Sequence, residues 1–291
     1  MTRREVVLLG HPVGHSVSPE LHQAAFDALG LPHRYRLVDV PDEPALAARL
    51  AELTRGEPWG ANVTVPWKRA ALALAARRTT DAAHAGAANV LYRDGDELVA
   101  ANTDVSALVG ELGRAAATRD AALVIGSGGA ALAAGLALVR LGFAAVRVTA
   151  RAFDGARSEW RGAEGFERMG VEPLAWPGDG GRGLEALAPR LSVVVQATSA
   201  GMRGAGDGDA LARRVPWGAL PPTAVAYDVV YNPRVTPFLD QARRHGLVAL
   251  DGVGMLVAQA VAAFELWFGA TPPGEVMREA AERALAARGA R

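Results

Sequence analysis

The segment 122–151 constrains the fold of this chain most strongly. An apolar run from Leu123 to Ile125 is followed by glycines at positions 126, 128 and 129, by a helical apolar pattern that ends at Leu141, and by a second β-branched run. This order predicts a strand, a glycine turn, a helix and a second strand. Glycine lets the backbone turn tightly and lets a pyrophosphate approach the helix N-terminus, so the segment predicts a nucleotide-binding unit.

The residues that follow the second predicted strand favour NADP over NAD. An NAD-binding domain normally places an acidic residue here, where it binds the ribose hydroxyls. This chain has Thr149, Ala150 and Arg151 instead. A guanidinium suits the 2′-phosphate of NADP, so we expect NADP(H) to be the cofactor.

Composition narrows the class of protein. The chain has 291 residues, which suggests two domains, and half of them are apolar. The formal net charge is zero, so the composition does not favour a nucleic acid or an anionic membrane as partner. Cysteine is absent, which excludes disulfides and thiolate nucleophiles and fits a reducing cytosol. The short apolar stretch near the N-terminus breaks at Gly10, too soon for a signal sequence or membrane span, so we expect a cytoplasmic protein.

Strand signals alternate with helical patterns along most of the chain, which predicts an α/β fold with mostly parallel sheets. We expect strands at 6–9, 35–40, 60–65, 193–196 and 225–229, and a hairpin of 89–93 with 98–101 around an Asp-Gly turn. We expect helices at 43–55, 68–76, 105–116 and 236–245, and two more from residue 254 onward. Residues 203–209 are expected to form a surface loop.

Two serines precede the first predicted helix. We expect Ser18 to be its N-cap and Pro19 its first residue. The expected apolar stripe of this helix consists of Leu21, Ala24, Ala25 and Leu29. Ser16 and Ser18 lie two residues apart, so their hydroxyls and the helix amides can hold one small carboxylate. The alternative is that the serines only form a turn and cap the helix.

Three histidines, His11, His15 and His22, lie in the same region. No carboxylate joins them at the spacing of metal ligands, and Pro19 separates His15 from His22. We therefore expect no metal site.

Polar residues gather where predicted strands end, and in an open α/β sheet ligands bind at the carboxyl ends of the strands. We therefore expect these side chains to converge on one site. Each residue also has a simpler interpretation by itself: Lys68 as a solvated surface residue, and Asp104 as the N-cap of a helix. The residues in question are Asn62, Thr64, Lys68, Asn89, Asn102, Thr103 and Asp104.

One polar side chain, Gln259, interrupts the apolar stripe of the first C-terminal helix. The stripe consists of Leu256, Ala260, Ala263, Phe264 and Trp267. A buried amide without partners costs roughly 1–3 kcal/mol, so Gln259 needs backbone groups or a bound polar ligand beside it. We favour the ligand because of the other polar residues.

The chain resembles the shikimate dehydrogenase family over essentially its full length. The segments that carry the resemblance are GHPVGHSVSPELHQAAF, GANVTVPWK, GAANVL, ANTD, VIGSGGA, ATSAGM, YDVVYNPRVTP and DGVGMLVAQAVAAFELWFG. The resemblance implies a two-domain α/β fold with the active site in the cleft between the domains. Residues 1–104 and the C-terminal helices 253–291 would form the substrate domain, and residues 105–252 a Rossmann-type NADP domain.

The resemblance also assigns roles to residues. Lys68 and Asp104 would be the catalytic pair. The substrate contacts would be Ser16, Ser18, Thr64, Asn89, Asp104, Tyr231 and Gln259. The cofactor contacts would be Gly126, Ser127, Gly128, Gly129, Ala130, Ala150, Arg151, Thr198, Met202, Val229 and Gly252. The chain departs from the family pattern after Asp104, where Val105 to Leu108 replace Gly-x-Gly-Phe. It departs again at residues 150–152, where the family has an Asn-Arg-Thr segment that holds the cofactor (the cofactor clasp) and this chain has Ala150, Arg151 and Ala152.

The implied activity is the NADP-dependent, reversible reduction of 3-dehydroshikimate to shikimate in chorismate and aromatic amino acid biosynthesis. Lys68 would supply the proton and Asp104 would orient it, in a monomer or homodimer. The alternatives are a paralogue that acts on quinate or an aminoshikimate, and a non-catalytic nucleotide-binding protein. A tetrahydrofolate-type dehydrogenase is a further alternative, which the serine pair and the ANTD segment disfavour.

Overall fold

The computed structural model describes residues 2–289 and divides into two compact units. The N-terminal unit comprises Met1–Asp104 and Leu256–Arg291, and the middle unit comprises Val105–Met255. Each unit has its own six-stranded sheet, which confirms the predicted α/β fold. Among the described residues, no helix combines the length and the apolar character needed to span a bilayer.

The sheet of the N-terminal unit has the order β2-β1-β3-β5-β6-β4. Strand β1 runs parallel to β2 and β3, while β5 and β6 form the antiparallel hairpin that the Asp94-Gly95 turn predicts. Strands β3 and β5 are antiparallel, and β4 is parallel to β6. The strands are β1 (Glu5–Gly10), β2 (Arg34–Asp39), β3 (Gly60–Val63), β4 (Arg77–Arg78), β5 (Val90–Asp94) and β6 (Glu97–Ala101).

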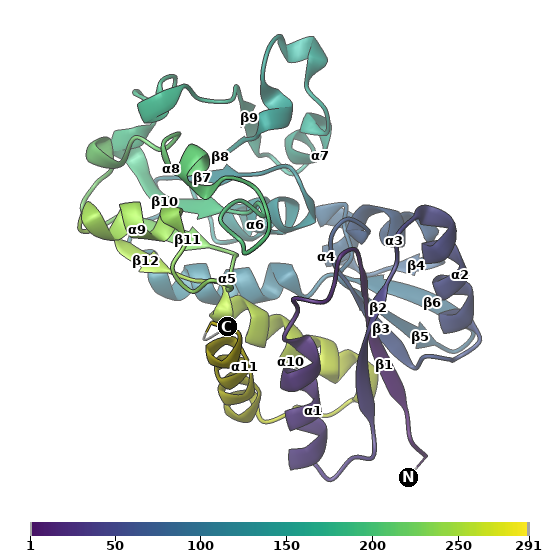
Figure 1. Cartoon of the computed structure of the whole chain (residues 1–291). Coiled ribbons are helices and arrows are strands. Elements are labelled where there is room, and N and C mark those ends of the chain that lie inside the picture. Colours follow the sequence, from purple (N-terminus) through teal and green to yellow (C-terminus); the bar gives the residue numbers. More distant parts are fainter. Residues whose placement is uncertain (1, 290–291) are drawn as a thin grey trace. The chain divides into compact units, whose positions relative to one another are not determined.

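Six helices complete the described part of this unit: α1 (Ser18–Ala28), α2 (Glu43–Thr54), α3 (Lys68–Leu74), α4 (Thr80–Ala85), α10 (Val253–Phe268) and α11 (Gly274–Gly289). Helix α1 packs against α11, although they lie at opposite ends of the sequence (Figure 1). Helix α2 buries Leu46, Leu50 and Leu53 in a core that it shares with Val7 and Leu9 of β1. In α10 the predicted apolar stripe is buried.

The structure corrects two expectations for α1. Its N-cap is Val17, and Ser18 is already inside the helix. The hydroxyl of Ser16 accepts the amide of Ser18, the first residue of the helix, and no side chain of the N-cap Val17 caps α1. Leu29 is 41% exposed and does not belong to the buried stripe, which is formed instead by Ser18, Leu21, His22, Ala25 and Phe26.

The sheet of the middle unit is entirely parallel, with the order β12-β11-β10-β7-β8-β9. Counted along the chain from β7, this is the 3-2-1-4-5-6 order of dinucleotide-binding folds, whose strand order reverses between the first and fourth strands. The point where the strand order reverses therefore lies between β7 and β10, and ligands of such folds generally bind at this point. The strands are β7 (Ala121–Ile125), β8 (Ala145–Thr149), β9 (Glu172–Leu174), β10 (Leu191–Gln196), β11 (Val225–Asp228) and β12 (Val248–Leu250).

The α-helices of this unit are α5 (Asp104–Ala115), α6 (Gly129–Arg140), α7 (Ala163–Glu167), α8 (Gly208–Ala212) and α9 (Pro237–Arg244), as Figure 1 shows. Helix α6 packs on β7 and β8 and buries nearly all of its small apolar side chains. The expectation of a surface loop over 203–209 is wrong at its end. Asp207 caps the Ala210 amide, so α8 begins at Gly208, which is buried.

Candidate active site

The structure brings Lys68 and Asp104 together. Lys68 is the first residue of α3 and Asp104 the first residue of α5. Lys68 Nζ lies 2.5 Å from Asp104 Oδ2, and the two side chains are 14% and 4% exposed. Removing one partner from such a pair leaves an uncompensated charge in a largely dry place, which is strongly destabilising. The pair can hold a proton donor at a fixed position.

Lys68 does not favour the helix in which it lies. A cation in the first turn faces the positive end of the helix dipole, and α3 has no acidic residue in that turn. Asp104 supplies the opposing charge from another element. The sequence holds a further signal for this residue, absent from the sequence predictions above: Lys68 is the only lysine of the chain, against thirty arginines.

Asn89 is the centre of the hydrogen-bond network around this pair. Its Oδ1 accepts the Thr103 amide at 2.7 Å. Its Nδ2 donates to Thr103 Oγ1 and to Asp104 Oδ1, both at 2.9 Å. Asn89 therefore fixes the carboxylate of Asp104 on the side opposite Lys68.

Gln259 of α10 borders the same network. Its Nε2 donates to the Leu256 carbonyl at 2.7 Å, and its Oε1 lies 3.4 Å from Asn89 Nδ2. That second contact is long because the two hydrogens of Asn89 Nδ2 already point to closer acceptors. The Gln259 amide therefore has a backbone partner, which is the alternative not favoured above, and its oxygen lies near Asn89.

Other polar residues of the predicted cluster make hydrogen bonds to the segments around Asn89. Asn62 Oδ1 accepts the Tyr35 hydroxyl at 2.7 Å, and Asn62 Nδ2 donates to the Asn89 carbonyl at 3.1 Å. Asn102 Nδ2 donates to the Ala87 carbonyl at 2.8 Å. Thr64 follows β3 and is partly buried, with its methyl group directly over Gly10.

The serine pair lies just before and within the first turn of α1. Ser16 and Ser18 are 5% and 8% exposed. The Ser16 hydroxyl donates to Ser18 Oγ at 3.0 Å and accepts the Ser18 amide at 3.2 Å. Two hydroxyls so close to one another and to the amide end of α1 can turn toward a single carboxylate.

The glycine turn after β7 fits a dinucleotide. Gly126 has φ +137°, and a Cβ atom there would lie 2.7 Å from the Ala197 carbonyl oxygen, so only glycine is accommodated. Gly128 is the N-cap of α6, and a Cβ atom there would meet nothing within 4 Å. The open space and the uncapped amides are what a pyrophosphate needs. Ser127, Gly129 and Ala130 are partly buried in the same turn.

The end of β8 offers one charged side chain. Arg151 is exposed in a short 3₁₀ turn (Arg151–Phe153), whereas Ala150 is 3% exposed and Ala152 is partly buried. The Thr149 hydroxyl is used internally, since it donates to the Ala175 carbonyl at 2.9 Å. Of the expected clasp, Arg151 alone has a charged or polar side chain.

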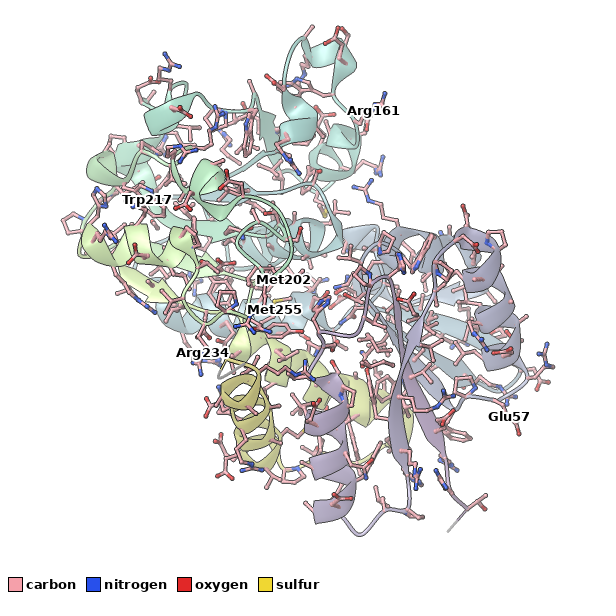
Figure 2. All side chains as sticks on the ribbon, in the orientation of Figure 1. Glu57, Arg161, Met202, Trp217, Arg234 and Met255 are labelled. Atoms are coloured by element: carbon pink, nitrogen blue, oxygen red, sulfur yellow. The ribbon has the colours of Figure 1, made fainter. Side chains whose placement is uncertain are left out.

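The ends of β10 and β11 hold the remaining predicted cofactor residues. Thr198 and Met202 are partly buried after β10; Met202 is labelled in Figure 2. Val229 follows β11, and Gly252 approaches it so closely that a Cβ atom on Gly252 would lie 2.2 Å from the Val229 carbonyl oxygen. Tyr231, also partly buried, belongs to the middle unit, unlike the other predicted substrate contacts.

Asp228 ends β11 as a fully buried carboxyl. Its Oδ2 accepts the Thr236 hydroxyl at 2.6 Å, and its Oδ1 accepts the Val230 amide at 2.9 Å. Burial raises the pKa of Asp228 to about 7, and these hydrogen bonds oppose that rise only in part. Asp228 thereby fixes the bend that leads from β11 into residues 229–236, a role that the sequence predictions above do not include.

The three histidines have separate environments. His11 Nδ1 pairs with Asp39 Oδ2 at 2.8 Å, a carboxylate partner that the sequence spacing did not reveal. His22 is fully buried and stacks on Tyr35, and burial lowers its pKa to about 3. Among residues 2–289, no cluster of three or more His, Cys, Asp or Glu side chains is placed to hold a metal ion.

Two family models match parts of this chain. Residues 8–91 match the model of the shikimate dehydrogenase substrate binding domain, and residues 252–282 match that of the shikimate 5′-dehydrogenase C-terminal domain. A protein of Rhodopseudomonas palustris named shikimate dehydrogenase (NADP(+)) is 38% identical over 276 residues, which is 94% of each chain.

Two crystal structures share the fold. Shikimate 5-dehydrogenase from Thermus thermophilus, in complex with NADP(H) and shikimate, has a TM-score of 0.80 at 34% identity and covers 97% of this chain and 100% of its own. Quinate dehydrogenase from Corynebacterium glutamicum, in complex with NAD, has a TM-score of 0.79 at 29% identity and covers 96% of this chain and 99% of its own. With a 38% identical relative aligned along nearly its whole length, this chain belongs to the shikimate dehydrogenase family.

Proposed function

We propose that this protein is an NADP-dependent shikimate dehydrogenase, which reversibly reduces the ring ketone of 3-dehydroshikimate to the hydroxyl of shikimate in chorismate and aromatic amino acid biosynthesis. The observation that carries the proposal is the Lys68–Asp104 pair, held at 2.5 Å and braced by Asn89. Relatives named shikimate dehydrogenase (NADP(+)) and a neighbour that binds NADP(H) and shikimate support it.

Lys68 acts on the reacting oxygen of the substrate. In the direction of reduction, its ammonium group stabilises the negative charge that develops on the ketone oxygen and donates a proton to it. In the direction of oxidation, the neutral amine accepts the proton of the hydroxyl. Asp104 Oδ2 holds Nζ in place, and Asn89 holds Asp104 in turn.

The serine pair and the amide side chains bind the rest of the substrate. Ser16 and Ser18 turn their hydroxyl hydrogens to the carboxylate, and the first turn of α1 adds the attraction of its dipole. Asn89, which donates to Asp104, and Gln259, whose Oε1 lies 3.4 Å from Asn89 Nδ2, bind ring hydroxyls. Thr64 and Tyr231 are the remaining substrate contacts in this proposal.

The middle unit holds the cofactor. When bound, NADPH supplies the hydride. The turn 126–130 and the amides of α6 would bind the pyrophosphate, and Arg151, with Ala150 beside it, would pair with the 2′-phosphate. Thr198, Met202, Val229 and Gly252 would be the remaining cofactor contacts.

The test is a measurement of NADPH formation with shikimate, quinate and an aminoshikimate, each with NADP and with NAD. We expect kcat/KM for shikimate with NADP to exceed every other combination by about tenfold or more, since a site built for one set of hydroxyls rejects analogues that leave its polar groups unpaired. A higher kcat/KM for quinate or the aminoshikimate would show that this compound, and not shikimate, is the substrate. No turnover with any of them would favour the non-catalytic alternative.

We place the reaction in the cytoplasm, in line with the absence of cysteine, and expect the enzyme to be a monomer or a homodimer. Sedimentation velocity at several protein concentrations distinguishes these two states from larger assemblies.

A further inference from the structure

Arg288 connects the last helix of the chain to the serine pair. It lies in the last turn of α11, 272 residues from Ser16 in sequence. Its guanidinium donates to the backbone carbonyls of His15 and Ser16, the latter at 3.1 Å. Its Nη2 also pairs with Glu20 Oε1 of α1 at 2.7 Å.

These contacts fix the backbone on both sides of the Ser16 side chain. Two consecutive carbonyls are bound by the planar, five-donor guanidinium, and Glu20 joins the same group to the first turn of α1. The side chain of Arg288 is only 29% exposed, so these charge-assisted bonds are partly shielded from water. The loop that carries Ser16 is therefore held from the end of α11.

The serine pair depends on this backbone. Ser16 Oγ serves as both the donor to Ser18 Oγ and the acceptor of the Ser18 amide, with both atoms within 3.2 Å. Both hydroxyls can turn toward one carboxylate only while their backbone positions stay fixed, since a misplacement of about 1 Å weakens such contacts severely.

The positive charge of Arg288 also reaches the loop. Burial, and after it the charge of Arg288, lowers the pKa of the neighbouring His15. Glu20 pairs with the same guanidinium and offsets much of this charge, so the contribution of Arg288 to anion binding is the fixed position of the backbone.

We propose that Arg288 is a positioning residue for carboxylate recognition, acting through the His15–Ser16 backbone on the Ser16 and Ser18 hydroxyls. This inference rests on the proposed function. Arg288 lies beyond residues 252–282, the range matched by the model of the C-terminal domain, so the contact is a property of this chain outside that match.

The experiment compares Arg288→Ala, Arg288→Lys and the matched control Arg283→Ala, which removes an arginine of the same helix that faces Glu279 at the surface. The dissociation constant of shikimate is measured by calorimetry, and KM and kcat for shikimate and NADP by steady-state kinetics. We expect Arg288→Ala to raise the Kd and KM of shikimate about tenfold, the usual cost of charge-assisted hydrogen bonds, and to leave KM for NADP unchanged. Arg288→Lys should restore part of the loss, and Arg283→Ala should change nothing.

A double-mutant cycle with Ser16→Ala separates this role from a general stabilisation of α11. If Arg288 acts through the serine, the combined variant loses much less affinity for shikimate than the sum of the single losses. Additive losses, or an unchanged Kd in a folded Arg288→Ala, overturn the inference. If Arg288→Ala does not fold, the same double-mutant cycle is measured with Arg288→Lys in its place, and additive losses again overturn the inference. Wild-type protein that binds shikimate without oxidising it contradicts the proposed function alone, and wild-type protein that does not bind shikimate contradicts both.

Discussion

The proposed sites of the two units are built by different means. In the N-terminal unit the site consists of side chains: Lys68, Asp104 and Asn89 meet within hydrogen-bond distance and brace one another. In the middle unit it consists mainly of backbone, because Gly126 and Gly252 lie so close to neighbouring carbonyl groups that a Cβ atom at either position would clash. A side-chain site fails when one functional group is removed, whereas a backbone site fails when one methyl group is added.

The largest expected effect tests the side-chain site. Lys68→Ala should lower kcat by about 10²- to 10⁴-fold, the usual contribution of a positioned proton donor, while KM for shikimate changes little. Steady-state kinetics in both directions measure this. Arg69→Ala, at the exposed neighbouring position of α3, is the control and should keep full turnover. Unchanged turnover in Lys68→Ala would refute the assignment and remove the contrast between the units.

The second prediction tests the backbone site by adding one methyl group. Gly126→Ala forces a residue with a Cβ atom to φ +137° and to 2.7 Å from a carbonyl oxygen, which costs about 1–3 kcal/mol or displaces the turn. We expect a lower melting temperature and a weaker binding of NADP. Gly128→Ala is the matched variant, because its Cβ atom meets nothing in the protein. It should keep the melting temperature and weaken only the binding of NADP. An equal loss of stability in both variants would count against the proposal that the turn 126–130 binds the pyrophosphate.

The third prediction concerns the one charged side chain of the predicted clasp in the middle unit. Arg151→Ala should reduce the preference for NADP over NAD by roughly 1.5–3 kcal/mol, the range for hydrogen bonds to charged groups. The ratio of kcat/KM for the two cofactors is the measurement. Arg157→Ala serves as control, since Arg157 pairs with Glu167. Equal losses for NAD and NADP would show that Arg151 does not read the 2′-phosphate.

The fourth prediction concerns the response of each unit to pH, an effect that vanishes near neutral pH for His22. His22 has a folded pKa of about 3, below its unfolded value of 6.5, so the unfolded state binds more protons between these values. Its contribution to stability is present above pH 6.5 and falls as the pH falls toward 3, by about 2 kcal/mol at pH 5. Chemical denaturation of wild type and His22→Phe between pH 5 and 8 measures this, and equal acid sensitivity in both would contradict it.

The effect of pH on stability has the opposite sign for Asp228, which lies in the middle unit. Its folded pKa of about 7 lies above the unfolded value of 3.8, so the folded state holds the extra proton and stability falls as the pH rises through that window. Asp228→Asn should remove this slope without affecting the acid sensitivity due to His22.

Sequence reasoning succeeded where a local pattern and a topological rule agree. The βαβ unit of β7, α6 and β8 follows from an apolar run, three glycines and a second run, which all lie within one segment. The meeting of Lys68 and Asp104 follows from their positions after strands, since the carboxyl ends of the strands share one edge of the sheet.

The features that sequence reasoning missed depend on partners elsewhere in the chain. Strands β4, β9 and β12 have only two or three residues, and Pro173 lies inside β9, so their pairing depends on neighbouring strands rather than on their own pattern. The residue type of Ser18 suits an N-cap, but α1 begins at Ser18 itself, its N-cap is Val17, and the Ser16 hydroxyl accepts the Ser18 amide. The contact of Arg288 with the serine loop joins the two ends of the chain and has no local signal.

Because the chain has a single lysine, a protease can be used to probe the site at Lys68. An endoprotease specific for lysine has one internal target in this sequence, the bond after Lys68, and its cleavage yields fragments 1–68 and 69–291. That bond lies at the start of α3 beside a largely buried side chain, so cutting requires the helix to unwind locally. The rate at which the two fragments appear on a gel therefore reports how often this one helix opens, and its slowing by an added compound reports occupancy of the site without any measurement of turnover.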